Sequence, residues 1–277
     1  MRFLRSRFCA SCAFALAMVV SASAAVGDQW IVSGWPQVDG TWLFDYTEGN
    51  ASATNGRALN FGGNTASLMV SGMDFDNQNR LFAMTSSGFY EVATATGDLT
   101  LRGAFGIGIE GAAAYDPSQN RFLVASGFGG IEEVNMTTFA HNSISPLTGI
   151  DDVSGIAVEN SGRIWILASN GNGSNNMELY ELQGSTPVSY GNLGISAAGV
   201  IAGFDVDSAG NLTVVSGNSL YRVSTTFGSP TATLVSTFNN TQGIYSGLAL
   251  QSVPEPSMAL FASFALIPMM RRRRNRK

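Results

Sequence analysis

Residues 72–84 read GMDFDNQNRLFAM, and similar stretches return at regular spacing along the chain. A glycine opens an apolar strand pattern, a polar turn follows, and a second apolar strand returns. The related stretches are GAAAYDPSQNRFLVA at 111–125, GIAVENSGRIWIL at 155–167 and GFDVDSAGNLTVV at 203–215. A fifth copy, GLAL at 247–250, supplies only one strand. The leading glycines are 39, 44, 48 and 44 residues apart, which is a spacing typical of repeat proteins.

Each unit also carries a third strand and a weaker fourth strand, such as residues 188–193. The third strands are predicted at residues 88–92, 131–134, 179–182 and 220–223. Four strands in about 40–45 residues are typical of a β-propeller blade. We therefore expect an all-β propeller, with the leading glycines where neighbouring blades crowd the central channel.

Closure of the ring predicts the blade number. The C-terminal strand at 246–251 can join two N-terminal strands, at 29–33 and 41–46, and an irregular strand within 47–65. This pairing would complete one composite blade and protect an open sheet edge. Five blades are then expected, or six if residues 26–70 form a blade of their own. The unit resembles the blades of NHL-type propellers over residues 72–250, which implies a propeller fold without implying catalysis.

The N-terminal 25 residues have the pattern of a secretory signal peptide. Three arginines precede an apolar stretch at 8–20, and small residues with a cleavage site near Ala24 follow. We expect a signal helix in residues 1–25, removed by signal peptidase during export. Cys9 and Cys12 both lie within it, so the mature domain at 26–252 would be exported without any disulfide.

Residues 253–277 form a three-part ending. It consists of Pro254-Glu255-Pro256, an uncharged apolar run at 258–270, and Arg271, Arg272, Arg273 and Arg274 followed by Asn275, Arg276 and Lys277. Proline keeps the first part extended and accessible, and the arginines favour the cytoplasmic side of a membrane. The alternative is a plain C-terminal membrane anchor.

This ending resembles the PEP-CTERM sorting signal of exported bacterial proteins. The resemblance implies that an exosortase, a membrane-embedded processing enzyme, recognises Pro254, Glu255 and Pro256. The short hydrophobic helix would anchor the chain in the inner membrane until processing. The body would then be released or transferred at the cell surface.

The charge of residues 26–252 excludes some partners. This segment has six arginines, no lysine and 19 aspartate or glutamate residues, a net charge of −13. Such a body repels phosphate backbones and anionic lipids, so nucleic-acid binding is not expected. The same charge favours solubility and attracts divalent cations.

Recurring carboxylates are the best candidates for a metal site. They are Asp74, Asp76, Asp116, Glu159, Asp205 and Asp207. Meeting at one end of a ring, they could bind Ca²⁺ through oxygen ligands. The alternative is that they cap turns by accepting backbone hydrogen bonds, and their recurrence favours it. Asp151 and Asp152, just before the third leading glycine, are candidates for a metal or sugar contact. Asp205 and Asp207 are further candidates for a metal.

Other chemistry finds little support in the sequence. The single histidine, His141, is expected in a polar loop without a catalytic partner. A zinc site of His and Cys ligands and a cysteine nucleophile are excluded in the mature body. Glu132-Glu133 is a second acidic pair, and paired carboxylates can hydrolyse glycosides. The tryptophans Trp30, Trp35 and Trp42 could stack on sugars, although such residues more often belong to the core. The glycine-rich residues 127–130 predict a hairpin and not a phosphate-binding loop, because no Lys-Ser or Lys-Thr follows them on a helix.

Two functions fit these patterns. The first is an exported, non-enzymatic propeller that binds extracellular polysaccharide or another surface protein. The second is a secreted propeller hydrolase or lyase with a divalent metal in its central channel. The second function requires several carboxylates to converge on the channel axis, whereas turn-capping carboxylates would be spread around the ring.

Overall fold

The computed structural model describes the central part of the chain. The described residues are 29–35, 40–47, 54–66, 68–105, 111–126, 130–147, 150, 152–169, 176–196, 202–207, 209–238 and 244–251. All regular elements in these ranges are β-strands, which confirms the all-β prediction. The described ranges hold no helix that could span a membrane. The signal helix and the C-terminal hydrophobic helix fall on residues outside them.

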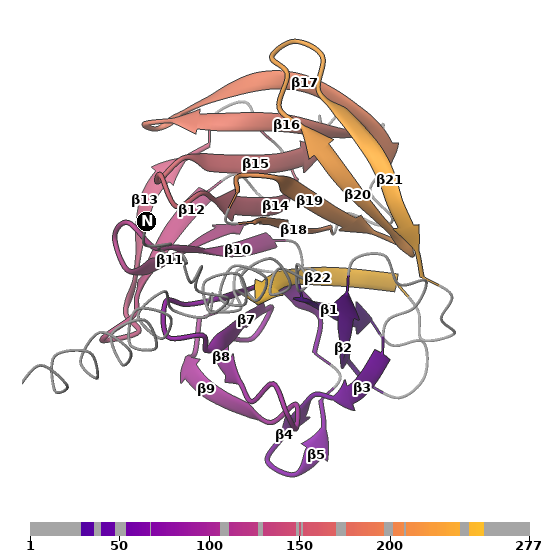
Figure 1. Ribbon diagram of the computed structural model, residues 1–277. Coiled ribbons are helices and arrows are strands. Elements are labelled where there is room, and N and C mark those ends of the chain that lie inside the picture. The colour runs from indigo at the N-terminus through magenta and orange to yellow at the C-terminus, as the bar shows by residue number, and fades with distance from the viewer. Residues whose placement is uncertain are drawn as a thin grey trace, which may run out of the picture.

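Four sheets are each built from four consecutive antiparallel strands, as the repeat predicts (Figure 1). Their first strands contain the leading glycines, and each polar turn of the repeat connects a first strand to a second strand. The sheets comprise β6 (Val70–Phe75), β7 (Leu81–Thr85), β8 (Phe89–Val92) and β9 (Leu99–Gly103); β10 (Gly111–Asp116), β11 (Arg121–Ser126), β12 (Gly130–Asn135) and β13 (His141–Pro146); β14 (Val153–Val158), β15 (Ile164–Ser169), β16 (Asn176–Gln183) and β17 (Thr186–Ser196); and β18 (Gly203–Val206), β19 (Leu212–Ser216), β20 (Ser219–Ser224) and β21 (Thr231–Thr237).

A further sheet joins the two ends of the described chain. The C-terminal strand β22 (Ile244–Gln251) pairs antiparallel with β1 (Gln29–Trp35), and β2 (Trp42–Thr47) and β3 (Thr54–Ala58) complete the order β22-β1-β2-β3. This composite sheet confirms the predicted pairing of the C-terminal strand with the N-terminal strands. A short hairpin of β4 (Asn60–Phe61) and β5 (Asn64–Thr65) follows it.

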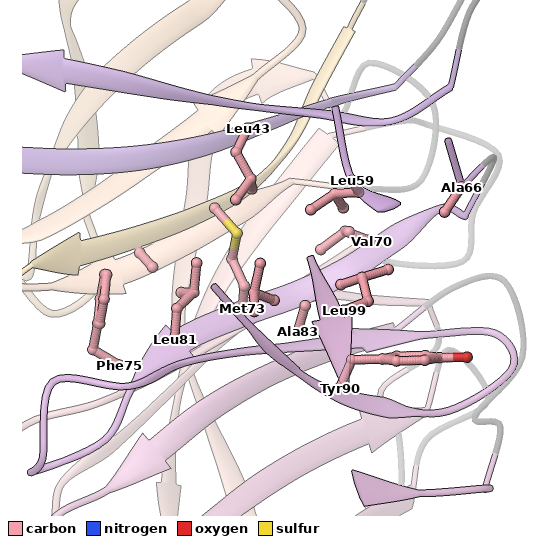
Figure 2. Close-up of a cluster of buried hydrophobic side chains, with 12 residues drawn as sticks. Leu43, Leu59, Ala66, Val70, Met73, Phe75, Leu81, Ala83, Tyr90 and Leu99 are labelled. Atoms are coloured by element: carbon pink, nitrogen blue, oxygen red, sulfur yellow. The ribbon is translucent and has the colours of Figure 1, made fainter. Parts of the chain in front are cut away.

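The first strands of the sheets contact one another in a closed cycle. β22 contacts β6, β6 contacts β10, β10 contacts β14, β14 contacts β18, and β18 contacts β22. Each pair of neighbouring sheets shares one buried apolar cluster. Figure 2 shows the cluster between the composite sheet and the β6–β9 sheet, where Leu43 and Leu59 lie across from Met73 and Leu81. The arrangement is that of a β-propeller, whose core is divided among the interfaces between its sheets.

Small residues at the start of the inner strands allow their backbones to approach closely. A Cβ atom at Gly72 would lie 2.1 Å from the backbone nitrogen of Ala113, and one at Gly203 would lie 2.5 Å from that of Leu248. These distances agree with the crowding predicted for the leading glycines. In the second repeat, however, Ala112 and not Gly111 occupies the equivalent place, since its side chain faces the next sheet.

The outermost strand of every sheet carries a β-bulge at the same place in the repeat. The register shifts lie after Leu43, Phe89, Ile131, Leu179 and Leu220 of the third strands. Bulges twist an exposed edge and oppose pairing with another chain. The innermost strand of each sheet is therefore covered by packing against its neighbours in the ring, and pairing along the outermost strand is interrupted by a bulge.

Candidate functional site

One face of the ring carries the turns that connect the first and second strands. Asp76, Asp116 and Asp207 each begin such a turn, and their carboxylates accept hydrogen bonds from backbone N–H groups two residues further on, at 2.9–3.0 Å. The Asp76 and Asp207 carboxylates also accept bonds from residues four positions further on, at 2.9 and 2.8 Å. These three carboxylates therefore cap turns, which is the structural alternative to metal binding. Glu159 occupies the fourth equivalent place and instead accepts a bond from the indole N–H of Trp165 at 2.7 Å.

Arginines neutralise part of this face. The guanidinium groups of Arg80, Arg121 and Arg222 lie 2.5, 3.1 and 3.3 Å from the carboxylates of Asp76, Asp116 and Asp207. The remaining three arginines of residues 26–252 also have carboxylate partners, in the pairs Arg57–Asp45, Arg102–Glu91 and Arg163–Glu181. All six arginines of the body are therefore paired within the fold, and the unbalanced charge is negative.

Asp74 and Asp205 behave differently from the turn aspartates, because each connects two sheets. The Asp74 carboxylate on β6 accepts a 2.7 Å hydrogen bond from the backbone N–H of Tyr115 on β10. Asp205 on β18 accepts a 2.6 Å bond from the backbone N–H of Leu250 on β22. The second oxygen of each carboxylate accepts a bond from the next residue of its own strand, at 2.6 and 2.7 Å. In the sequence these two residues look like the turn aspartates, because the repeat pattern carries no signal for a contact between sheets.

Burial disfavours the charged form of both bridging carboxylates. The Asp74 carboxyl lies deep between sheets, although the residue keeps some exposed surface, and burial raises its pKa to about 7 despite the backbone hydrogen bonds that lower it. Burial also raises the pKa of Asp205 well above its ordinary value, and repulsion from Asp74 adds to the increase. Such shifts are common at functional sites but also arise in structural networks.

The space on the ring axis is narrow, and the inner strands form its wall mainly with glycine, alanine and larger apolar residues. Its wall consists of Ser71, Gly72, Met73, Ala112, Ala113, Gly155, Ile156, Ala202, Gly203, Phe204 and Leu248. Among the described residues of this wall, Ser71 alone has a polar side chain. The recurring carboxylates Asp74, Asp76, Asp116, Glu159, Asp205 and Asp207 are not among them.

The candidate metal ligands do not assemble among the described residues. Nowhere in the described ranges do three His, Cys, Asp or Glu side chains lie together as a metal site would require. Asp152 precedes β14 and adopts a left-handed conformation with a φ of 50°, whereas Asp151 lies outside the described residues. Asp205 and Asp207 are the bridging and turn-capping carboxylates described above. The sorting residues 254–256 and 271–274 also lie outside the described part.

His141 lies in a different environment from the one predicted. It begins strand β13 instead of lying in a loop, and its Nδ1 atom is 2.9 Å from a carboxylate oxygen of Glu132. Its ring stacks on Phe105 at a centroid distance of 4.3 Å. The neighbouring Glu133 pairs with Arg121 at 2.7 Å, so the acidic pair is divided between two structural contacts.

A network on the β14–β17 sheet was not foreseen from the sequence. The Arg163 guanidinium donates two hydrogen bonds to Glu181, at 2.7 and 2.8 Å, and one to the Tyr190 hydroxyl at 2.7 Å. It also lies over the Trp165 ring at 4.2 Å. The Arg163 hydrogen bonds lower the pKa of Glu181 to about 2. Glu181 lies on strand 3 and Tyr190 on strand 4, so only the folded sheet brings the three groups together.

The two tryptophans whose side chains the structure describes, Trp42 and Trp165, form no exposed sugar platform. Trp42 is partly buried, stacks on Phe44 and packs against the cluster between the β18–β21 and composite sheets. Trp165 is fully buried. The side chains of Trp30 and Trp35, and residues 127–129 of the glycine-rich hairpin, lie outside the described part.

The fold and these contacts define a β-propeller, and comparison with solved structures agrees. A chain from a nidogen/laminin complex has a TM-score of 0.59 and 12% sequence identity, over 82% of this chain and 99% of that one. TolB from Acinetobacter baumannii scores 0.48 at 11% identity, over 81% of this chain and 66% of that one. At 12% identity the likeness to the nidogen/laminin chain concerns the fold alone, and the lower TolB score carries no argument. No protein-family model and no curated protein matches the chain in sequence.

Proposed function

We propose that the chain is an exported, non-enzymatic binding module whose five four-stranded sheets are the five blades of one closed ring. The structural hydrogen bonds that the carboxylates accept are the main support for the non-enzymatic assignment. Asp76, Asp116 and Asp207 bind turn amides and arginines, while Asp74 and Asp205 bind the amides of neighbouring strands. Groups engaged in holding the fold are poorly placed to act as metal ligands or general bases.

Charge narrows the class of binding partner. The arginines of the body are all paired, and its net charge is −13. A neutral polysaccharide or a basic surface protein suits such a surface better than an acidic polysaccharide does. The bulged outer strands also favour recognition by side chains and loops over addition of a strand to a sheet edge.

Export and processing rest on the two ends of the sequence. The N-terminal 25 residues have the pattern of a signal peptide, and residues 253–277 resemble a PEP-CTERM signal. In this proposal the secretion machinery and signal peptidase act first, and the C-terminal segment then anchors the chain in the inner membrane. An exosortase acts near Pro254, Glu255 and Pro256 and delivers the propeller to the cell surface.

Cell fractionation with intact-mass measurement tests export. In a host with an exosortase, the wild-type body is expected at the surface or in the medium, without residues 1–25 and without the arginine tail. Substitution of Pro254, Glu255 and Pro256 by alanine should leave the chain in the inner membrane with its tail attached. A control that changes exposed Gln78 to alanine should be processed normally. Delivery of the triple variant to the surface, cut at the same position as the wild-type chain, would refute exosortase processing through these residues.

A calcium titration followed by thermal unfolding tests the non-enzymatic assignment. A specific metal site would raise the melting temperature with ligand concentration by mass action. We expect no shift at millimolar Ca²⁺. A saturable increase that Asp151→Asn or Asp152→Asn abolishes would favour the metal-dependent alternative.

A further inference from the structure

The two ends of the propeller domain leave the ring side by side, at the same face. Gln29, the first residue of β1, is the register partner of Gln251, the last residue of β22. The membrane-directed segments at residues 1–25 and 253–277 therefore attach at neighbouring points. Only three residues, 26–28, separate the first segment from β1.

The position of this exit on the ring follows from the direction of the inner strands. Gly72 lies against Ala112 and Ala113, and Asp74 bonds to Tyr115, so β6 and β10 run parallel. Gly203 near Leu248 and Asp205 bonded to Leu250 give the same direction for β18 and β22. Gln251 thus lies at the end of the ring where the turns that begin with Asp76, Asp116 and Asp207 are found.

We propose that, while the C-terminal segment is anchored, this turn-bearing face of the ring is held against the membrane and the opposite face is displayed. The inference deepens the proposed function and rests on its membrane anchor. The displayed face carries the β7–β8 turn at Ser86 and the β19–β20 turn at Asn218. Partners would reach the propeller from that side.

The length of the tether supports this orientation. Six residues, 252–257, separate β22 from the apolar run, and fully extended they reach about 20 Å. The tail starts at an innermost strand, so inversion of the ring would require it to cross the width of a four-stranded sheet, about 14 Å, and then the height of the ring, about 20 Å. A path of about 35 Å exceeds the reach of the tether.

The chemistry of the turn-bearing face is compatible with a nearby bilayer. Its turn carboxylates Asp76, Asp116 and Asp207 are paired with arginines, which reduces repulsion from anionic lipid headgroups. The turns between the inner strand pairs are short and capped by hydrogen bonds. We infer a face that tolerates proximity to the membrane and need not insert into it.

The absence of cysteine from residues 26–252 provides a direct test. In a Cys9→Ser, Cys12→Ser background, single cysteines replace exposed Gln78 or Gln119 on the turn-bearing face and exposed Ser86 or Asn218 on the other. The full chains are expressed in a bacterial host that lacks an exosortase. Spheroplasts are labelled with a fluorescent maleimide and quenched with spin-labelled phospholipid. Labels at 78 and 119 should be quenched several-fold more than labels at 86 and 218.

The outcomes separate this inference from the proposed function. Equal or reversed quenching of membrane-bound chains would overturn the orientation and leave the anchor intact. Recovery of the chain in the soluble fraction, with residues 253–277 still present by mass, would overturn both. Insertion of a Gly/Ser linker of about 40 residues after Gln251, with a root-mean-square length of about 35 Å, should abolish the difference in quenching. A difference that persists would show that the short tether does not set the orientation.

Discussion

The interfaces between neighbouring sheets are of two kinds, although they derive from one repeated motif. Where β6 meets β10, and where β18 meets β22, the inner strand has the sequence Gly-x-Asp and its carboxylate binds an amide of the next strand. At the other three interfaces the equivalent residues are alanines, namely Ala114, Ala157 and Ala249. At two interfaces a carboxylate thus bridges the neighbouring sheets, whereas apolar packing occupies the equivalent place at the other three.

The difference shows that an aspartate at this place in the repeat can bridge two sheets only where their backbones lie close together. At Gly72 and Gly203 a Cβ atom would lie within about 2.5 Å of the next backbone, so a carboxylate two residues later can reach an N–H group. At Gly155 the nearest atom of the next strand is the Cβ of Phe204, 2.6 Å from an added Cβ. A side chain, and not an amide, therefore fills that interface. An aspartate is useful only where an amide is within reach.

The largest effect is expected from moving an aspartate into an alanine interface. Ala157 is fully buried beside Trp165 and Phe204, so Ala157→Asp would place a carboxylate among apolar groups. We expect a loss of about 3–5 kcal/mol in the free energy of unfolding at pH 8, measured by urea denaturation. Ala157→Asn introduces a side chain of similar size without the charge, so it should lower the free energy of unfolding by less than Ala157→Asp does. A loss below about 1 kcal/mol for the aspartate would mean that this interface also offers a donor.

The second-largest loss of stability is expected where the backbones of β6 and β10 approach closely. Gly72→Ala would place a methyl group 2.1 Å from the Ala113 nitrogen, and the strands would have to separate. We expect a loss of about 1–3 kcal/mol. The matched control is Ala112→Gly, the reverse change at the equivalent residue of the next sheet, which should cost about 0.5–1 kcal/mol from backbone entropy alone. Equal losses for the two variants would contradict the close approach of β6 and β10.

The pH dependence of stability distinguishes the bridging carboxylates. The pKa of Asp74 is raised to about 7, so between pH 4 and 7 the folded state binds more protons than the unfolded state. The stability contributed by Asp74 is therefore complete below about pH 4 and is lost as pH rises through 7. Asp205 acts in the same direction. Glu181, whose pKa is lowered to about 2, acts oppositely and only below about pH 4.5.

Asp74→Ala should flatten this dependence. At pH 5 we expect it to cost about 1–3 kcal/mol, because the Tyr115 and Phe75 amides lose their acceptor. At pH 8 the loss should be smaller, since the buried charge is also removed. Unfolding curves at the two pH values, with exposed Asp98→Asn as the control, measure the change. An identical loss at both pH values would show that burial does not perturb Asp74.

The smallest effect is expected at a turn. Asp207→Ala removes an acceptor for the amides of Ala209 and Asn211, which water can replace at the surface, and should cost about 1 kcal/mol. Asp205→Ala, two residues earlier, should cost more at pH 5 because it also opens the contact between β18 and β22. A larger loss at residue 207 would reverse the assigned roles of the turn and bridging carboxylates.

Much of the architecture was predictable because it depends on short-range pattern. Alternating apolar residues and polar turns predicted the strands, and the incomplete fifth copy predicted that β22 would pair with β1. The turn-capping alternative for Asp76, Asp116 and Asp207 was also predictable, since an Asx turn involves only neighbouring residues. The loop prediction for His141 was wrong. His141 was assigned to a loop because its partner Glu132 is brought near only by strand pairing.

The repeat, the strand pattern and the charge of the body follow from the amino-acid order alone, because each is a property of neighbouring residues or of composition. Tertiary structure decided which aspartates bridge sheets and at which face both ends of the domain leave the ring. Asp74 and Asp76 differ by only two positions, yet one bonds to Tyr115 in the next sheet and the other to its own turn. The choice depends on the distance between backbones of different sheets, and that distance exists only once the ring has packed.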